Sequence, residues 1–169
     1  MKKIWIISLV LIGLTSCQQN NIVFVDTAKL INDYQEKKDI ETKYKARFEV
    51  FDKKTDSLST AFQTEAMEFD SKAASMSKTA AQERYNQLLQ KRQAMSQQLQ
   101  MEQQSLSKES QTEIDSLVSR VKAFIKDFGK EKGYTYILGA NEAGSVLYGE
   151  EAKDITAEVL KALNEDYKK

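Results

Sequence analysis

The chain has 169 residues, enough for one domain, and its 25 basic residues balance its 25 acidic residues. A chain without excess positive charge lacks the electrostatic footprint of nucleic-acid binding, so we expect no nucleic-acid partner. It has no histidine and a single cysteine, which argues against histidine catalysis, a disulfide framework and a thiolate metal site. We therefore expect no enzyme activity, no catalytic residue, no metal site and no cofactor.

The N-terminus has the features of a secretory signal. Two lysines precede an apolar run at residues 4–14, which is too short to span a bilayer comfortably. The run ends in the sequence LTSC, residues 14–17, which resembles a bacterial lipobox. We predict a lipoprotein signal peptide at 1–16 and lipidation of Cys17. The alternative is an ordinary signal peptide that contains an incidental cysteine.

The residues after the predicted lipidation site are polar. Residues 18–21 read QQNN, so we expect 17–21 to form a short lipidated tether. Gln18 stands where an aspartate retains lipoproteins in the inner membrane of enteric bacteria. The resemblance to lipoproteins implies more than one acyl chain, and two or more chains anchor a protein stably. We therefore predict a periplasmic location, with the chain anchored to the outer membrane.

The middle of the chain predicts long helices. It contains no proline, and no glycine lies between Gly13 and Gly129, so more than a hundred residues lack the usual helix breakers. Apolar residues recur there in steps of three and four, interrupted by polar residues at Thr55, Arg92, Glu102 and Ser110, which is typical of a coiled coil. The first stripe comprises Ile40, Tyr44, Phe48, Phe51, Leu58, Phe62, Ala66, Phe69, Ala73 and Met76. The second comprises Leu88, Met95, Leu99, Leu106, Ile114, Leu117, Val121, Phe124 and Phe128.

Three short segments have strand patterns. Residues 22–25 are apolar and mostly β-branched, as in a strand that is buried on both faces. Residues 134–138 and 145–148 are also strand-like, and the glycine-containing segment 139–144 between them predicts a β-hairpin.

Capping residues mark the ends of the predicted helices. Asp26 or Thr27 can cap a helix that follows the first strand, and Gly133 can supply the left-handed residue that ends the long helical region. Asp154 or Thr156 can cap an amphipathic helix near the C-terminus.

The length of the helical region favours a hairpin over a rod. A continuous helix over 34–132 would separate the first strand from the others by roughly 150 Å, so the strands could not share a sheet. We therefore predict an arm at 34–132 that folds back near 77–79, where residues 79–82 (TAAQ) fit a capping box. Residues 22–33 and 133–169 would then form a small β-body at its base.

Such a β-body is too small to bury much core by itself, so we expect it to oligomerise. Its apolar strand residues are the expected contacts between subunits. The alternative is that they face only the helices of their own chain. The expected contacts are Val23, Val25, Tyr136, Leu138, Val146 and Tyr148.

The two ends of this pattern resemble the Skp/OmpH family. The most specific blocks are 132–134 (KGY) and 154–156 (DIT), the latter followed by Val159 and Leu160. The resemblance implies an α+β, mainly α fold: a long antiparallel helical hairpin on a small β-body that assembles into a homotrimer, with three arms around a cavity. It also implies clients, namely unfolded outer-membrane β-barrel proteins. Because this chain is nearly neutral and has a lipobox, unlike the best-known members, no lipopolysaccharide site is carried over.

We therefore expect an ATP-independent periplasmic holdase that prevents aggregation of unfolded outer-membrane proteins. Unfolded chains expose apolar segments in no fixed register, and flexible methionines suit such promiscuous binding. Residues on the apolar stripes can instead pack helix on helix, whereas Met67 and Met101 lie off the stripes. The predicted client contacts are Phe62, Met67, Phe69, Met76, Leu88, Met95 and Met101.

Two other classes of protein are alternatives to the holdase, namely a structural tether and an enzyme. A lipid-anchored coiled coil that spaces or tethers the outer membrane would also have polar, charge-balanced arms. An enzyme is disfavoured because carboxylates such as Asp52 and Asp56 come without a nucleophile, pocket-forming loop or phosphate cradle. A solvated helix face accounts for those carboxylates.

Overall fold

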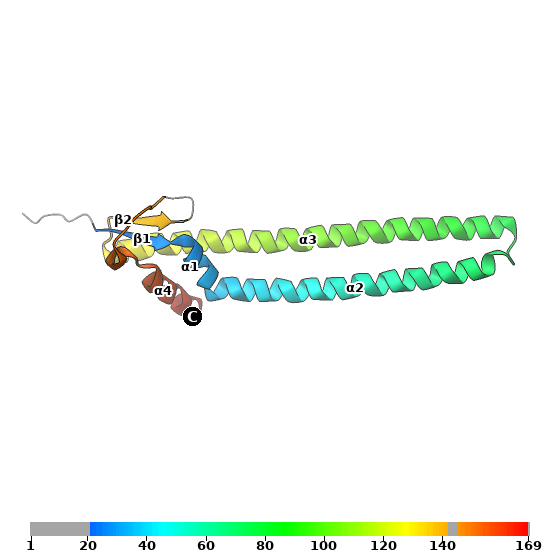
Figure 1. Ribbon diagram of the computed structural model, residues 1–169, viewed down its shortest axis with the longest axis horizontal. Helices are drawn as coiled ribbons and strands as arrows, with labels where there is room; N and C mark the ends of the chain where they lie inside the picture. Colours follow the sequence, from blue (N-terminus) through cyan, green and yellow to red (C-terminus); the bar gives the residue numbers. More distant parts are fainter. Residues whose placement is uncertain (1–20, 142–144, 169) are drawn as a thin grey trace, which may run out of the picture.

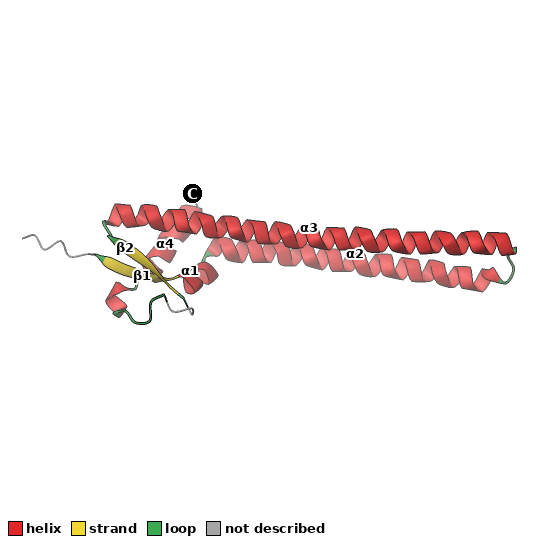
Figure 2. Cartoon of the chain, turned by 90° about the horizontal axis from the view of Figure 1, so that it is seen from above, coloured by secondary structure: helices red, strands yellow, loops and turns green. Residues whose placement is uncertain are grey.

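The computed structural model describes residues 21–141 and 145–168. Figure 1 shows two long helices lying side by side, with the remaining elements gathered at one end, and the view in Figure 2 agrees. We call the two long helices and their connection the arm, and the gathered elements the base. The elements are β1 (Ile22–Asp26), α1 (Thr27–Asp33), α2 (Gln35–Ala73), α3 (Lys78–Lys132), β2 (Tyr136–Ala140), a 3₁₀ turn (Glu151–Lys153) and α4 (Thr156–Tyr167).

The two strands pair in parallel. The register runs from Ile22 opposite Tyr136 to Asp26 opposite Ala140. Parallel strands need a long crossover connection, and here that connection is α1 followed by the whole arm. The prediction that a helical hairpin brings distant strands together at one end is confirmed.

The core lies in the base and in the adjoining half of the arm. Leu30 of α1, Leu117 of α3 and Val159 of α4 are completely buried, and Val25 is 1% exposed. These side chains belong to one apolar cluster that reaches up the arm as far as Phe51. The C-terminal helix is therefore packed into the same core as the arm.

Two helix ends have the predicted caps. The Asp26 carboxylate accepts a hydrogen bond from the Lys29 backbone N–H at 2.9 Å. Gly133 ends α3 with a φ of 71°, and the next backbone N–H, that of Tyr134, donates to the Gly129 carbonyl at 2.9 Å. A left-handed residue at this position is easiest for glycine.

The predicted capping box at the far end of the arm is wrong. The N-cap of α3 is Ser77, whose hydroxyl accepts from the Ala80 backbone N–H at 3.2 Å. Thr79 already lies inside the helix, and the Gln82 side chain donates to Asn86 instead of reaching back. Ser77 is the N-cap because it has the extended backbone of a capping residue and stands immediately before the first helical turn.

The predicted β-hairpin is also wrong. Gly139 lies inside β2, and residues 145–148 form no strand. The returning chain meets β1 only later, through a bridge between Phe24 and Asp154. Gly149 packs against the Phe24 ring, where an added Cβ would collide with it. Residues 145–148 pair with no described strand, and Leu147 and Tyr148 are 92% and 85% exposed.

The start of α4 is capped from just outside the helix. Its N-cap is Ile155, which has no capping side chain. The Asp154 carboxylate accepts from the Thr156 backbone N–H at 2.8 Å and from the Thr156 hydroxyl. The Thr156 hydroxyl oxygen accepts in turn from the Asp26 backbone N–H at 2.8 Å. The block DIT thus joins α4 to β1.

Candidate functional site

The arm is packed unevenly along its length. Near the base, Ile40, Tyr44 and Phe51 of α2 are buried, as are Leu106 and Leu117 of α3. Between residues 52 and 105, which are all described, the only buried side chain is Leu88. The outer half of the arm therefore has far less buried apolar surface than the half next to the base.

Ion pairs join α2 to α3 along the whole arm. Successive pairs move by seven, four, seven and eleven residues up α2, and by the same numbers back down α3. An antiparallel pair of helices with no slip in register has this property. The pairs are Glu36 with Arg120, Lys43 with Glu113, Arg47 with Glu109, Lys54 with Glu102, and Glu65 with Lys91 and also with Arg84.

Several of these ion pairs shift the pKa values of the side chains that form them. The hydrogen bond from Lys91 holds the pKa of the Glu65 carboxyl below its ordinary value, and Arg84 adds to the effect. The hydrogen bond from Lys43 likewise lowers the pKa of Glu113. The same hydrogen bond raises the pKa of Lys43. The pair of Lys43 and Glu113 therefore favours the charged form of both of its partners, one on each helix.

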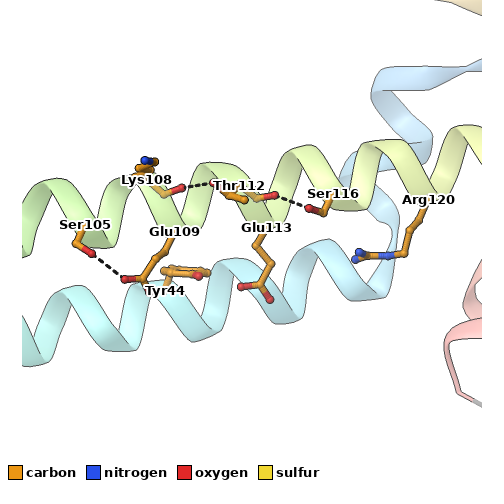
Figure 3. A pocket seen from close by; sticks show the side chains of 8 residues that line it. All are labelled: Tyr44, Ser105, Lys108, Glu109, Thr112, Glu113, Ser116 and Arg120. Carbon is orange, nitrogen blue, oxygen red and sulfur yellow. Dashed lines mark hydrogen bonds between the residues drawn. The ribbon is translucent and has the colours of Figure 1, made fainter.

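A shallow groove of about 480 Å³ lies between the helices near the base. Figure 3 shows Glu109 and Glu113 reaching from α3 toward α2 beside Tyr44. The groove's hydroxyls are engaged locally: Ser105 donates to Glu109 at 2.9 Å, and Thr112 donates to a backbone carbonyl at 2.8 Å. The Glu109 carboxylate that accepts from Ser105 is also paired with Arg47 of α2, so the groove presents polar groups that are engaged with one another.

The predicted client contacts divide by exposure. Met67 and Met101 are 70% and 64% exposed, and Met76 is 37% exposed. Phe62, Phe69 and Met95 are half-buried between the helices, whereas Leu88 is buried. Of these residues, only the exposed methionines are directly available to another molecule. The half-buried residues lie in the outer half of the arm, where little apolar surface is buried.

Sequence reasoning missed two exposed apolar residues on the outer half of α3. Tyr85 is 49% exposed and Leu89 is 37% exposed. Leu89 directly follows Leu88, so an apolar pair in a glutamine-rich segment was the available signal. They widen the apolar surface that the outer arm presents.

The predicted contacts between subunits also divide in two. Val23 and Val25 are buried in the core of their own chain, so we no longer expect them to contact a second subunit. Tyr136, Leu138 and Tyr148 are 59%, 43% and 85% exposed. Val146 is half-buried, and Leu147, which was not predicted, is the most exposed of the large apolar side chains described.

The described part of the sheet has one unpaired edge. The outer side of β2 faces no other described strand, since β1 lies on its opposite side. An open edge next to exposed aromatic side chains is a feature that proteins usually cover.

Cys17, the predicted lipidation site, lies outside the described residues. No helix within residues 21–141 and 145–168 is both long and apolar enough to cross a membrane.

Comparison with known proteins decides the family. Residues 21–163 match the family model described as outer membrane protein (OmpH-like). The chain belongs to the Skp/OmpH family. It is 23% identical over 155 residues to the chaperone protein Skp of Yersinia enterocolitica, covering 92% of this chain and 93% of that protein.

Two further comparisons agree with this membership of the Skp/OmpH family. Outer membrane protein 26 of Haemophilus influenzae is 41% identical over 51 residues, which are 30% of this chain and 24% of that one. The fold matches the crystal structure of an OmpH-like protein from Caulobacter crescentus CB15 with a TM-score of 0.78 and 17% identity, covering 86% and 85% of the two chains. The family is one of outer membrane chaperones that includes Skp.

Proposed function

We propose that this Skp/OmpH protein is an ATP-independent holdase, which binds unfolded outer-membrane β-barrel proteins in the periplasm and prevents their aggregation. The observation that carries the proposal is the outer half of the arm. Its seam buries only Leu88, while Met67 and Met101 are 70% and 64% exposed. Flexible, exposed thioethers can adapt to apolar segments that arrive in no fixed register.

The ion pairs support the proposal because they maintain the arm without a filled core. Glu65 binds both Lys91 and Arg84 in the outer half, where burial is sparse. Exposed ion pairs contribute little stability each, so the outer arm stays aligned while remaining easy to deform. A holder of many different clients benefits from both properties.

We also propose that the protein is a homotrimer held by the base. The open edge of β2 and the exposed Tyr136, Leu138, Leu147 and Tyr148 support an interface there. Pairing this edge with another chain would satisfy its backbone groups and cover the aromatic side chains. Three arms that leave one joint base would surround a volume in which clients are kept apart.

The lipobox supports anchoring to the outer membrane through Cys17. A short polar tether, residues 17–21, would keep the base close to the bilayer. Anchoring of this kind keeps the chaperone near the membrane without requiring a basic surface, which fits the equal numbers of acidic and basic residues.

Dilution of a urea-unfolded β-barrel protein into the mature chain, residues 18–169, tests the holdase. We expect light scattering to fall to the baseline near one trimer per client, without nucleotide, and a complex of matching mass in size-exclusion chromatography. Scattering that stays unchanged in the presence of a well-folded trimer would contradict the proposal.

A membrane tether is the second candidate, and the series of ion pairs from Glu36 to Lys91 favours it, since these pairs keep the two helices of a long spacer in register. The same dilution assay separates the two functions. A tether has no need to suppress aggregation, whereas its removal from cells would alter the spacing of the envelope in electron micrographs.

A further inference from the structure

The two helices of the arm join the base in different ways. Helix α3 continues without interruption into the core, where Val121 and Phe128 are buried. Helix α2 is separated from α1 by the single residue Tyr34, which has an extended ψ of 129°. Figure 1 shows α1 crossing from β1 to the start of α2, with the C-terminal end of α4 beside that start.

The first turn of α2 is capped by a residue distant in the sequence. Tyr34 occupies the N-cap position and makes no side-chain capping bond. Instead, the Asn164 side-chain carbonyl oxygen, from α4, accepts from the Gln35 backbone N–H at 3.0 Å. The first backbone N–H groups of a helix have no partner within it, so α4 supplies one that the local sequence lacks.

A second contact lies one turn further along α2. The Tyr167 hydroxyl, at the end of α4, donates to the Asp39 carboxylate at 3.0 Å. The Asp39 carboxylate also accepts from the Gln35 side-chain amide at 2.8 Å. The hydrogen bond to Asp39 raises the pKa of the Tyr167 hydroxyl, so this phenol stays protonated and able to donate.

Aromatic packing completes the contact. The Tyr34 and Tyr167 rings meet edge to face with centroids 6.0 Å apart. Tyr34 is 5% exposed, and burial together with hydrogen bonding to Glu36 raises the pKa of its hydroxyl. Glu36 is in turn paired with Arg120 of α3. The break between α1 and α2 is thus held from two sides, by α4 and by α3.

We propose that α4 fixes the direction in which the arm leaves the base, with Asn164 and Tyr167 as the positioning residues. Val159 and Leu163 anchor α4 in the core, so its outer end is a fixed support for the start of α2. Without this support the start of α2 is held to the base by its packing on α1 and α3.

The length of the arm amplifies any movement at its root. Residue 63 lies ~42 Å along α2 from residue 35, so a rotation of about 10° at the root would move it by roughly 7 Å. If the protein is the holdase proposed above, the direction of its arms sets the volume between them. The effect on that volume rests on the proposed function, whereas the contacts between α4 and the start of α2 do not depend on it.

Distances between spin labels test the role of α4. Labels at Gln63→Cys on the arm and Ala152→Cys on the base are placed in residues 18–169, which contain every described element, and labelled chains are diluted with unlabelled ones. In Asn164→Ala/Tyr167→Phe we expect the distance distribution to widen and its mean to move, by less than the roughly 7 Å sideways displacement because only the component along the line between the labels is measured. Helicity by circular dichroism should be unchanged.

The matched control makes the same two chemical changes on the arm, as Asn86→Ala/Tyr85→Phe, and should leave the distribution unchanged. A residue that only stabilised the fold would lower the melting temperature without changing distances in the folded protein, and that result would overturn the proposal. Should the double variant lose helicity, Tyr167→Phe alone keeps the ring packing and removes only the hydroxyl, and an unchanged distribution there would overturn it too. All distances are measured without client, so failure of the holdase assay leaves this test intact.

Discussion

The Lys54 ammonium of α2 lies 2.6 Å from the Glu102 carboxylate of α3. This pair stands in the middle of a series whose steps are equal on both helices. Sliding α2 along α3 by seven residues in one direction would place Glu36 opposite Glu113. Sliding it by seven residues in the other direction would place Lys43 opposite Arg120. Because like charges repel in either case, the charge pattern specifies one register for an arm whose outer core is too sparse to do so alone.

Reversing one charge of this central pair should weaken the arm, and reversing both should restore it. Both side chains are more than a third exposed, at 40% and 35%, so we expect Lys54→Glu to lower the free energy of unfolding by only about 0.5 to 1 kcal/mol. Urea unfolding followed by circular dichroism measures the change. Adding Glu102→Lys should recover most of it.

Lys53→Glu is the matched control for that experiment, because it makes the same change on the neighbouring exposed side chain, which has no ion pair among those described. An equal loss in Lys53→Glu, or no recovery in the double variant, would mean that net charge and not pairing determines the stability of the arm.

Acid should loosen the arm. Ion pairs hold the pKa values of Glu65, Glu109 and Glu113 below the ordinary 4.5. A carboxyl whose pKa is lower in the folded state stabilises that state above its unfolded pKa, and this contribution is lost as the pH falls through the folded pKa. We therefore expect the urea midpoint to fall as the pH drops from about 5 to about 3.

The variant Glu109→Gln/Glu113→Gln should show a smaller fall over the same pH range, since two of the linked groups no longer titrate. Glu49→Gln, at an exposed position of the same arm, is the control and should follow the parent protein. Parallel curves for all three proteins would show that these ion pairs do not determine the acid sensitivity.

The hairpin was predictable because its determinants are local and repeated. Apolar residues in steps of three and four, the lack of breakers and Gly133 as a terminator all act within a few residues, and the structure has the expected helices. The position of the turn was predictable to within a few residues, but its cap was not. Ser77 and Thr79 are both good N-caps, and nothing in the local sequence decides between them.

The base was harder to predict because its determinants are long-range. Residues 145–148 have a strand pattern, yet they pair with no described strand although the outer edge of β2 is open, and the chain meets the sheet again only where Asp154 bridges to Phe24 on β1. Capping of Gln35 by Asn164 joins residues 129 positions apart, and no local pattern signals it. Sequence reasoning identified the exposed methionines of the arm. It predicted that 22–25 is buried on both faces, whereas only Val23 and Val25 are buried and Ile22 is exposed, and it could not tell that the valines are covered by their own chain.

Lipidation should depend on Cys17. In a Gram-negative host, the intact chain should incorporate labelled palmitate and fractionate with the outer membrane, and Cys17→Ser should abolish incorporation. As a control, replacing residues 1–17 with the signal peptide of a soluble periplasmic protein should move the chain to the soluble periplasmic fraction. Membrane fractionation that persists in this control would mean that something other than the acyl chains holds the protein.

Charge in the exposed apolar segment of the base should prevent assembly. Leu147 and Tyr148 are 92% and 85% exposed in the single chain, so Leu147→Asp/Tyr148→Asp should change the stability of the isolated fold by less than about 0.5 kcal/mol. Burying the new carboxylates between subunits is costly, and light scattering should therefore report single chains instead of trimers. Tyr85→Asp, on the arm, should remain trimeric; an unchanged mass for the base variant would exclude this interface.

Replacing the exposed methionines should weaken client holding while leaving the fold intact. Removing two apolar anchors at ~1 kcal/mol each predicts that Met67→Gln/Met101→Gln needs roughly thirtyfold more chaperone to suppress aggregation. Val50→Gln is the control, because Val50 is 67% exposed but lies on the half of α2 nearer the base. If both variants lose activity equally, exposed apolar area anywhere on the arm matters; if neither does, the half-buried Phe62, Phe69 and Met95 become the residues to test.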